Sequence, residues 1–89
     1  MLADVIEVQH LEGYTIRVVF EDGLHGVIDL RDCAHDGGIF APLEDVDFFA
    51  KCQVNRKTGT IDWPNGADLA PEFLYERLKE QYSYSEQKS

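Results

Sequence analysis

The chain has 89 residues, with 17 acidic against 8 basic side chains and a formal net charge of -9. This length fits one small domain. The charge disfavours direct binding to nucleic acid or to an anionic membrane surface, because both are negatively charged. The same charge would steer a basic protein toward the chain, although an acidic surface also serves solubility. Composition therefore favours another protein as the partner and leaves self-association open.

The cysteines and the N-terminal residues indicate a cytoplasmic protein. Cys33 and Cys52 are too few for the disulfide framework of a small secreted domain. The first residues, MLADVIEV, carry acids where a signal peptide has basic residues. No stretch approaches the roughly 20 apolar residues of a membrane span. We therefore expect a cytoplasmic chain with reduced thiols.

The N-terminal third predicts three strands. VIEVQHL, from Val5, is rich in β-branched residues. YTIRVVF, at 14–20, alternates, with Ile16, Val18 and Phe20 on one face. After the hairpin loop EDG at 21–23, LHGVIDL returns with alternating apolar residues at 24–30. Residues 5–30 therefore predict an antiparallel meander with one buried face.

The middle of the chain has no single period. Residues 31–38 are predicted as a loop, and residues 39–52 as short helical turns. Pro42 can begin one such turn, and the side chain of Asp45 or Asp47 can cap another. Two short strands then follow, at 52–55 and 60–63, joined by a turn that ends at Gly59.

The stretch DWPNGADLAPEFLYERL, at 62–78, predicts a tight corner from strand to helix. Trp63 precedes a proline, which favours extended backbone, and Asn65-Gly66 is a turn signal. Pro71 suits the first helical position, which makes Ala70 the N-cap of a helix over about 71–82. Its predicted buried stripe is Phe73, Leu74 and Leu78, extended by Tyr82, with Arg77 and Lys79 outward.

These elements together predict an α+β fold. It comprises a small antiparallel sheet, made of the N-terminal meander plus one or two short strands, with short helical turns and one C-terminal helix. Residues 1–82 are predicted to form a single domain, and residues 83–89 a polar tail that frays. We further predict that Trp63 is a buried anchor between sheet and helix.

The order of FEDG, VIDL and IDWPNGADLAPEFLY resembles the bacterial family called domain of unknown function 2442, over roughly residues 4–78. The resemblance implies a small α+β domain with a sheet and a C-terminal helix. It also implies that a second small protein is encoded beside this one, in a pair that looks like toxin and antitoxin. The family usually has Ser where this chain has Ala70. It implies no activity for any residue.

No catalytic or metal-binding pattern emerges from the residues. Cys33, His35 and Cys52 do not have a common zinc spacing and lack an obvious fourth ligand. His25 and Asp29 would lie roughly 13 Å apart along one strand, too far for a direct pair. The nucleophile, zinc-helix and phosphate-loop motifs are missing. We therefore expect no catalytic residues, no metal and no cofactor, and we favour a protein that is not an enzyme.

Two functional hypotheses remain. The first is a non-catalytic protein-interaction module, the acidic member of a small two-protein pair. The alternative is a small-ligand-binding or enzymatic domain that uses the corner from Trp63 to Asp68. The binding candidates are conspicuous aromatic and polar residues of the corner, the meander and the middle segment. They are Trp63, Asn65, Asp68, Tyr75, Tyr14, Phe48 and Phe49.

Overall fold

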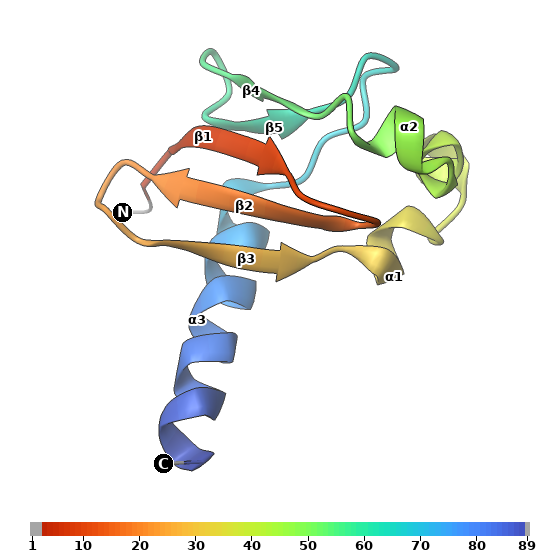
Figure 1. Cartoon of the computed structure of the whole chain (residues 1–89). Helices are drawn as coiled ribbons and strands as arrows, with labels where there is room; N and C mark the ends of the chain where they lie inside the picture. Colours follow the sequence, from red (N-terminus) through yellow and green to blue (C-terminus); the bar gives the residue numbers. More distant parts are fainter. Residues whose placement is uncertain (1–2, 89) are drawn as a thin grey trace.

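The computed structural model describes residues 3–88, with side chains described for 3–80. Within these described residues, nine elements follow one another (Figure 1). They are β1 (Val5–His10), β2 (Thr15–Phe20), β3 (His25–Asp29), α1 (Arg31–Ala34), the 3-10 helix η1 (Gly38–Glu44), α2 (Val46–Phe49), β4 (Gln53–Asn55), β5 (Thr60–Asp62) and α3 (Pro71–Lys88). The mixed α+β architecture predicted from the sequence is confirmed.

The first three strands form an antiparallel sheet in the order β1-β2-β3, which confirms the meander. Ile16 pairs with Ile28 across β2 and β3, and Val8 pairs with Val18 across β1 and β2. The β2–β3 turn uses Gly23 at a φ of 96°, a conformation that favours glycine. The register is continuous between β2 and β3 but shifts between Val5 and Glu7, as in a β-bulge.

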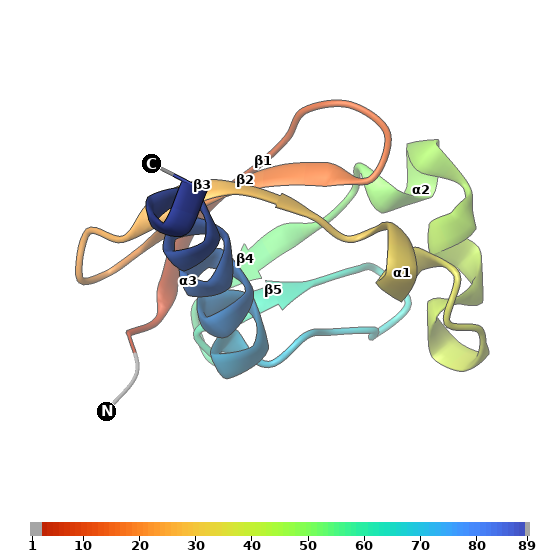
Figure 2. The same ribbon diagram turned by 90° about the horizontal axis from the view of Figure 1, so that it is seen from below.

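The other elements leave one face of this sheet open. Figure 2 shows helix α3 and the β4–β5 hairpin on the same side of the sheet, with α1, η1 and α2 gathered at one end. Residues that alternate toward the opposite face, such as Glu7, Gln9 and Val27, are exposed. An antiparallel sheet with one packed and one solvated face accounts for the alternating pattern in the sequence.

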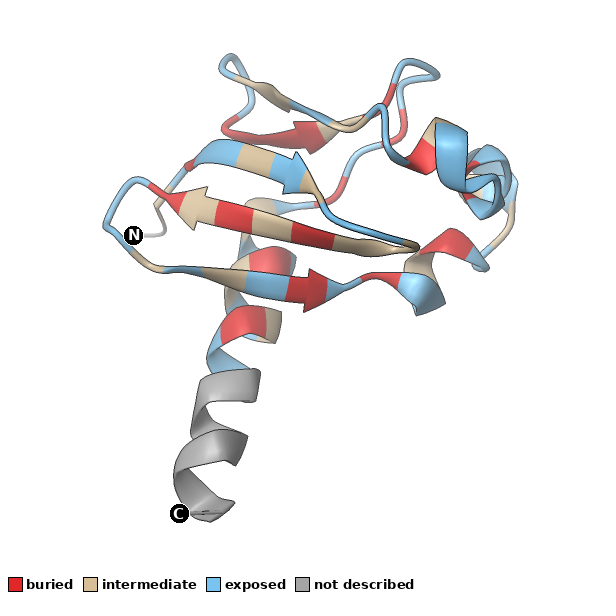
Figure 3. Ribbon diagram, in the orientation of Figure 1, coloured by how far each residue is buried: buried red, intermediate tan, exposed pale blue. Residues whose placement is uncertain are grey.

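The buried residues form a single hydrophobic cluster between the sheet and the elements that cover it (Figure 3). Each strand of the meander contributes, and so do α3, η1, α2 and the corner after β5. The largest fully buried side chains are Trp63, Phe20, Phe49, Ile16, Ile28, Leu30, Leu43, Ile61, Leu74, Leu78 and Val18. The predicted burial of Trp63 is thus confirmed, with only 2% of the residue exposed.

Two local predictions for the middle of the chain were wrong. The predicted loop at 31–38 contains helix α1, which begins where the Asp29 carboxylate accepts a hydrogen bond from the Arg31 backbone N–H at 2.9 Å. Pro42 lies inside η1 and does not begin a helix. The predicted cap is present at Asp45, whose side chain accepts a hydrogen bond from the backbone N–H of Asp47.

Helix α3 begins at Pro71, as predicted, and the carbonyl of Ala70 accepts the first helical hydrogen bonds. Leu74 and Leu78 are buried, but Phe73 is 37% exposed, which corrects the predicted stripe. Phe73 directly precedes Leu74, so the helical turn of about 100° per residue carries it away from the core. Arg77, predicted to point outward, is half-buried in an ion pair.

The helix continues to Lys88, beyond the predicted end at Tyr82. The side chain of Tyr82 and those of the predicted polar tail at 83–89 lie outside the residues whose side chains the structure describes. Within the described part of the chain, no helix combines the length and apolar character needed to cross a bilayer.

Candidate interaction surface

The corner after β5 turns its conspicuous side chains toward the rest of the chain. The indole Nε1 of Trp63 donates a hydrogen bond of 2.9 Å to the backbone carbonyl of Phe49. The side-chain amide of Asn65 donates to the carbonyl of Ile39 at 2.9 Å and accepts from the N–H of Ala67 at 3.2 Å. Gly66 closes the turn at a φ of 91°. The side chains of Trp63 and Asn65 therefore both hold the segment that contains η1 and α2.

Tyr14, in the turn just before β2, makes a third contact of the same kind. Its hydroxyl donates a hydrogen bond to the backbone carbonyl of Glu44. Its ring packs edge-on against Phe49 and His35, each at a centroid distance of 5.4 Å. Tyr14, Trp63 and Asn65 thus each donate to a carbonyl between residues 39 and 49. Three of the predicted binding residues therefore hold this segment in place through hydrogen bonds to its backbone.

We call residues 36–50 the acidic lobe. It contains Asp36, Glu44, Asp45 and Asp47, all exposed, and the sequence has no Lys or Arg between 36 and 50. The lobe also exposes two large apolar side chains, Ile39 at 53% and Val46 at 37%. The lobe therefore combines exposed carboxylates and exposed aliphatic side chains within one segment of the chain.

Glycines present the most exposed of these apolar residues. Gly37 and Gly38 have φ values of 80° and 58°, in the left-handed region that L-residues with side chains rarely adopt. Ile39 follows directly, and its carbonyl is held by Asn65. Neither Ile39 nor Val46 was among the binding residues predicted from the sequence. The available signal was a pair of glycines ahead of an apolar residue in an otherwise acidic segment.

The four remaining predicted binding residues lie in four different places. Phe48 is half-buried in the lobe, whereas Phe49 is fully buried in the core, 5.7 Å from Trp63. Asp68 is exposed and pairs through its backbone with Asp62. Of these residues, Phe48 alone adds a partly accessible ring to the acidic lobe, in addition to the half-buried Phe40.

Tyr75 lies on α3, away from the lobe. Its hydroxyl donates a hydrogen bond of 2.5 Å to a carboxylate oxygen of Asp22, in the β2–β3 turn. This bond raises the pKa of Tyr75 and lowers the pKa of Asp22. The ring also packs edge-on against Phe20 at 4.9 Å. Tyr75 thus ties one flank of α3 to the sheet.

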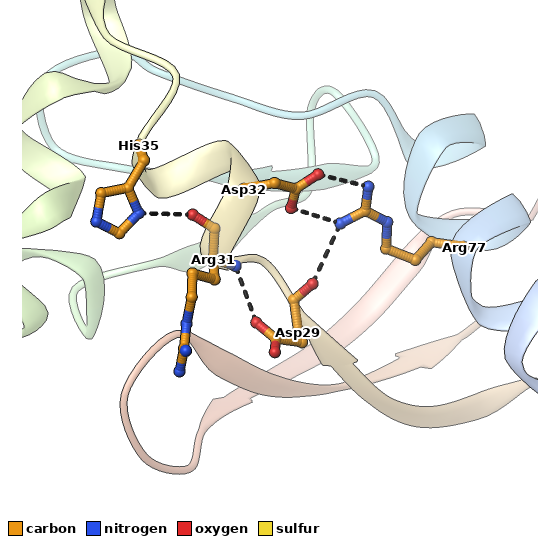
Figure 4. Close-up of polar contacts among 5 residues, drawn as sticks. All are labelled: Asp29, Arg31, Asp32, His35 and Arg77. Carbon is orange, nitrogen blue, oxygen red and sulfur yellow. Dashed lines mark hydrogen bonds and ion pairs between the residues drawn. The ribbon is translucent and has the colours of Figure 1, made fainter.

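Arg77 ties the opposite flank of α3 to helix α1 (Figure 4). Its Nη1 and Nη2 lie 2.8 and 2.9 Å from the two carboxylate oxygens of Asp32, and Nη1 donates to the carbonyl of Asp29 at 3.1 Å. These bonds lower the pKa of Asp32 to about 2. Sequence reasoning missed this pair, because its partners are 45 positions apart.

The thiols and histidines offer little for catalysis. Burial raises the pKa of Cys52 to about 11, and burial beside Asp32 raises the pKa of Cys33, so both thiolates are disfavoured at neutral pH. His10 and His35 each bond through one ring nitrogen to a backbone carbonyl. Among the residues that the structure describes, no three His, Cys, Asp or Glu side chains converge as a metal site would require.

Comparison with known proteins identifies the family. The model of the family described as "Protein of unknown function (DUF2442)" matches residues 5–80. The chain belongs to this family. No curated protein and no solved structure matches the chain. The DUF2442 match includes the meander, the acidic lobe, the corner and the described side chains of α3 up to Glu80.

Proposed function

We propose that this DUF2442 protein is a non-catalytic protein-interaction module, and that its acidic lobe binds a basic protein partner in the bacterial cytoplasm. One observation carries the proposal. The lobe combines four exposed carboxylates with exposed Ile39 and Val46, and it contains no Lys or Arg. The carboxylates would speed encounter with a basic surface, and the aliphatic side chains would supply contact energy.

The way the lobe is held supports the same proposal. Tyr14, Trp63 and Asn65 fasten its backbone at Glu44, Phe49 and Ile39. A surface fixed before binding loses less conformational entropy when the partner arrives. The alternative is a ligand site at the corner. It finds less support, because Trp63 and Asn65 already use their side-chain polar atoms within the chain.

The natural candidate for the partner is the small protein expected to be encoded beside this one, the second member of a toxin–antitoxin-like pair. Purified samples of both proteins would be titrated calorimetrically at about 50 mM and about 500 mM salt. We expect micromolar or tighter binding that weakens with salt, because exposed charges are screened. No binding at low salt would contradict the pairing.

Variants then locate the contact. Asp36→Lys with Glu44→Lys reverses charge in the lobe, and Ile39→Ser removes its most exposed aliphatic group. Each change should weaken binding at least tenfold. The matched control is Glu7→Lys with Glu21→Lys, which alters net charge equally at exposed positions outside the lobe. Equal losses from both double variants would show that overall charge, and not the lobe, determines binding.

A further inference from the structure

A second surface, separate from the acidic lobe, lies on the outer flank of α3. A shallow hollow is lined there by Glu72, Phe73, Glu76, Arg77 and Glu80. Phe73, at 37% exposure, is the one aromatic residue among the large hydrophobic side chains that the described part of the chain exposes. An aromatic ring in an acidic hollow has the chemistry of a cation acceptor, because the face of its π-system is electron-rich.

The chain itself places a cation on this ring. The guanidinium carbon of Arg77 lies 4.6 Å from the ring centroid of Phe73, and the guanidinium is held there by the Asp32 carboxylate. This intramolecular contact shows that the ring accepts a guanidinium, and 37% of Phe73 remains exposed beside it.

The carboxylates beside Phe73 are arranged to attract such a group. Glu72, Glu76 and Glu80 follow one another at intervals of four, so they are neighbours on the helix surface. Like charges at this spacing are mildly destabilising. Arg77 also lines the hollow, but its guanidinium is engaged by Asp32 and interacts with Glu80, which leaves Glu72 and Glu76 for another cation. A cation from another molecule would therefore relieve repulsion among these glutamates as well as contact the ring.

We propose that this flank of α3 docks an arginine-bearing segment of a protein partner, with a guanidinium stacked on Phe73 and bonded to the carboxylates of Glu72 and Glu76. Arginine is favoured over lysine, because its planar and weakly hydrated guanidinium both stacks on rings and pairs with carboxylates in two-point contacts. The site is independent of the acidic lobe, so it can fail while the proposed function stands, and the reverse also holds.

The test uses the full chain and a synthetic helical peptide with arginine at every fourth position. Two matched peptides carry lysine or the neutral analogue citrulline at those positions. Amide shifts of the isotope-labelled chain report where each peptide binds, and titration gives Kd. We expect amide shifts centred on residues 72–80. The arginine peptide should bind more tightly than the lysine peptide, and the citrulline peptide should show no binding.

Single substitutions distinguish a specific arginine site on α3 from nonspecific attraction between a basic peptide and an acidic protein. Phe73→Leu keeps an apolar side chain but removes the ring, and it should raise Kd about two- to fivefold, the range of an exposed cation–π contact. Glu76→Gln should raise Kd by a similar factor, whereas Glu7→Gln, on another exposed surface, should not. An unfolding curve for each variant confirms that it is folded.

Three results would overturn the proposal. The first is an unchanged Kd in both Phe73→Leu and Glu76→Gln. The second is equal affinity for the arginine and lysine peptides, and the third is an equal loss in Glu7→Gln. The lobe variant Asp36→Lys with Glu44→Lys should keep the dependence of peptide binding on Phe73. Failure at α3 is therefore distinguishable from failure of the lobe to bind its partner.

Discussion

The corner at 62–71 and the acidic lobe at 36–50 both contain aromatic and acidic residues, but only the lobe exposes large apolar side chains. The corner buries Trp63 and bonds the side chain of Asn65 to the carbonyl of Ile39. The lobe exposes Ile39, Val46 and its carboxylates. The difference teaches that the most conspicuous residues in a sequence can be those that hold a surface in place. The surface itself is made of ordinary residues.

The largest expected effect separates Trp63 of the corner from Ile39 of the lobe by their contributions to stability. Trp63→Ala should lower the free energy of unfolding by ~3–5 kcal/mol, because it leaves a cavity and removes the hydrogen bond to Phe49. Ile39→Ala should change it by less than ~0.5 kcal/mol, since 53% of Ile39 is already exposed. Urea unfolding of both variants measures the two values. Equal midpoints for Trp63→Ala and the parent would mean that the corner is not part of the core.

A smaller effect separates Asn65 from Asp68 within the corner. Asn65→Ala loses the bonds to Ile39 and Ala67, which should lower the free energy of unfolding by ~1 kcal/mol. It should also shift the amide resonances near Ile39, because the lobe loses one of its three fastenings. The matched change Asp68→Ala removes an exposed carboxylate and should stay within ~0.5 kcal/mol. A larger loss at Asp68 would reverse the roles assigned to the two residues.

The sequence could predict those features of the fold that depend on neighbouring residues, but not those that depend on contacts between distant ones. The meander could be predicted, because alternation in 14–30 places Ile16, Val18 and Phe20 on one face whatever lies elsewhere. The corner could be predicted because Pro and Gly act on their own backbone. The candidate surface could not. The bonds from Tyr14, Trp63 and Asn65 to the lobe join residues 30, 14 and 26 positions apart, beyond any local pattern.

The same limit explains the errors on α3. Helical spacing predicted that Leu74 and Leu78 would be buried, and they are. It also assigned Phe73 to the core and Arg77 to solvent, because hydrophobicity was the only local guide. Arg77 is instead drawn inward by Asp32 and the carbonyl of Asp29. The pitch of the helix fixes the side on which each residue lies, but the partners that draw Arg77 inward are distant in sequence and leave no local pattern.

The smallest expected effect concerns the ion pair that ties α3 to α1, just before the lobe. In the folded chain the hydrogen bonds from Arg77 lower the pKa of Asp32 to about 2, from an ordinary value of 3.8. A carboxyl whose pKa is lower in the folded state binds its proton more readily when unfolded. Asp32 therefore stabilises the fold above about pH 4, and that contribution is lost as pH falls from about 4 to about 2.

The size of the contribution is limited by solvent, because the side chain of Asp32 is 63% exposed and exposed ion pairs are screened. Asp32→Asn should be slightly less stable than the parent at pH 6 and indistinguishable from it near pH 2, by urea unfolding at each pH. The control Asp36→Asn removes an exposed carboxyl outside this ion pair. The contrary result is that Asp36→Asn reduces the change in unfolding free energy between pH 6 and pH 2 as much as Asp32→Asn does. That result would assign the pH dependence to the overall negative charge and not to the Asp32–Arg77 ion pair. If only Asp32→Asn shows the difference, an ion pair holds the helix that precedes the lobe, whereas neutral side chains hold the lobe itself at residues 39–49. Acid should then weaken the ion pair and leave the hydrogen bonds from Tyr14, Trp63 and Asn65 intact.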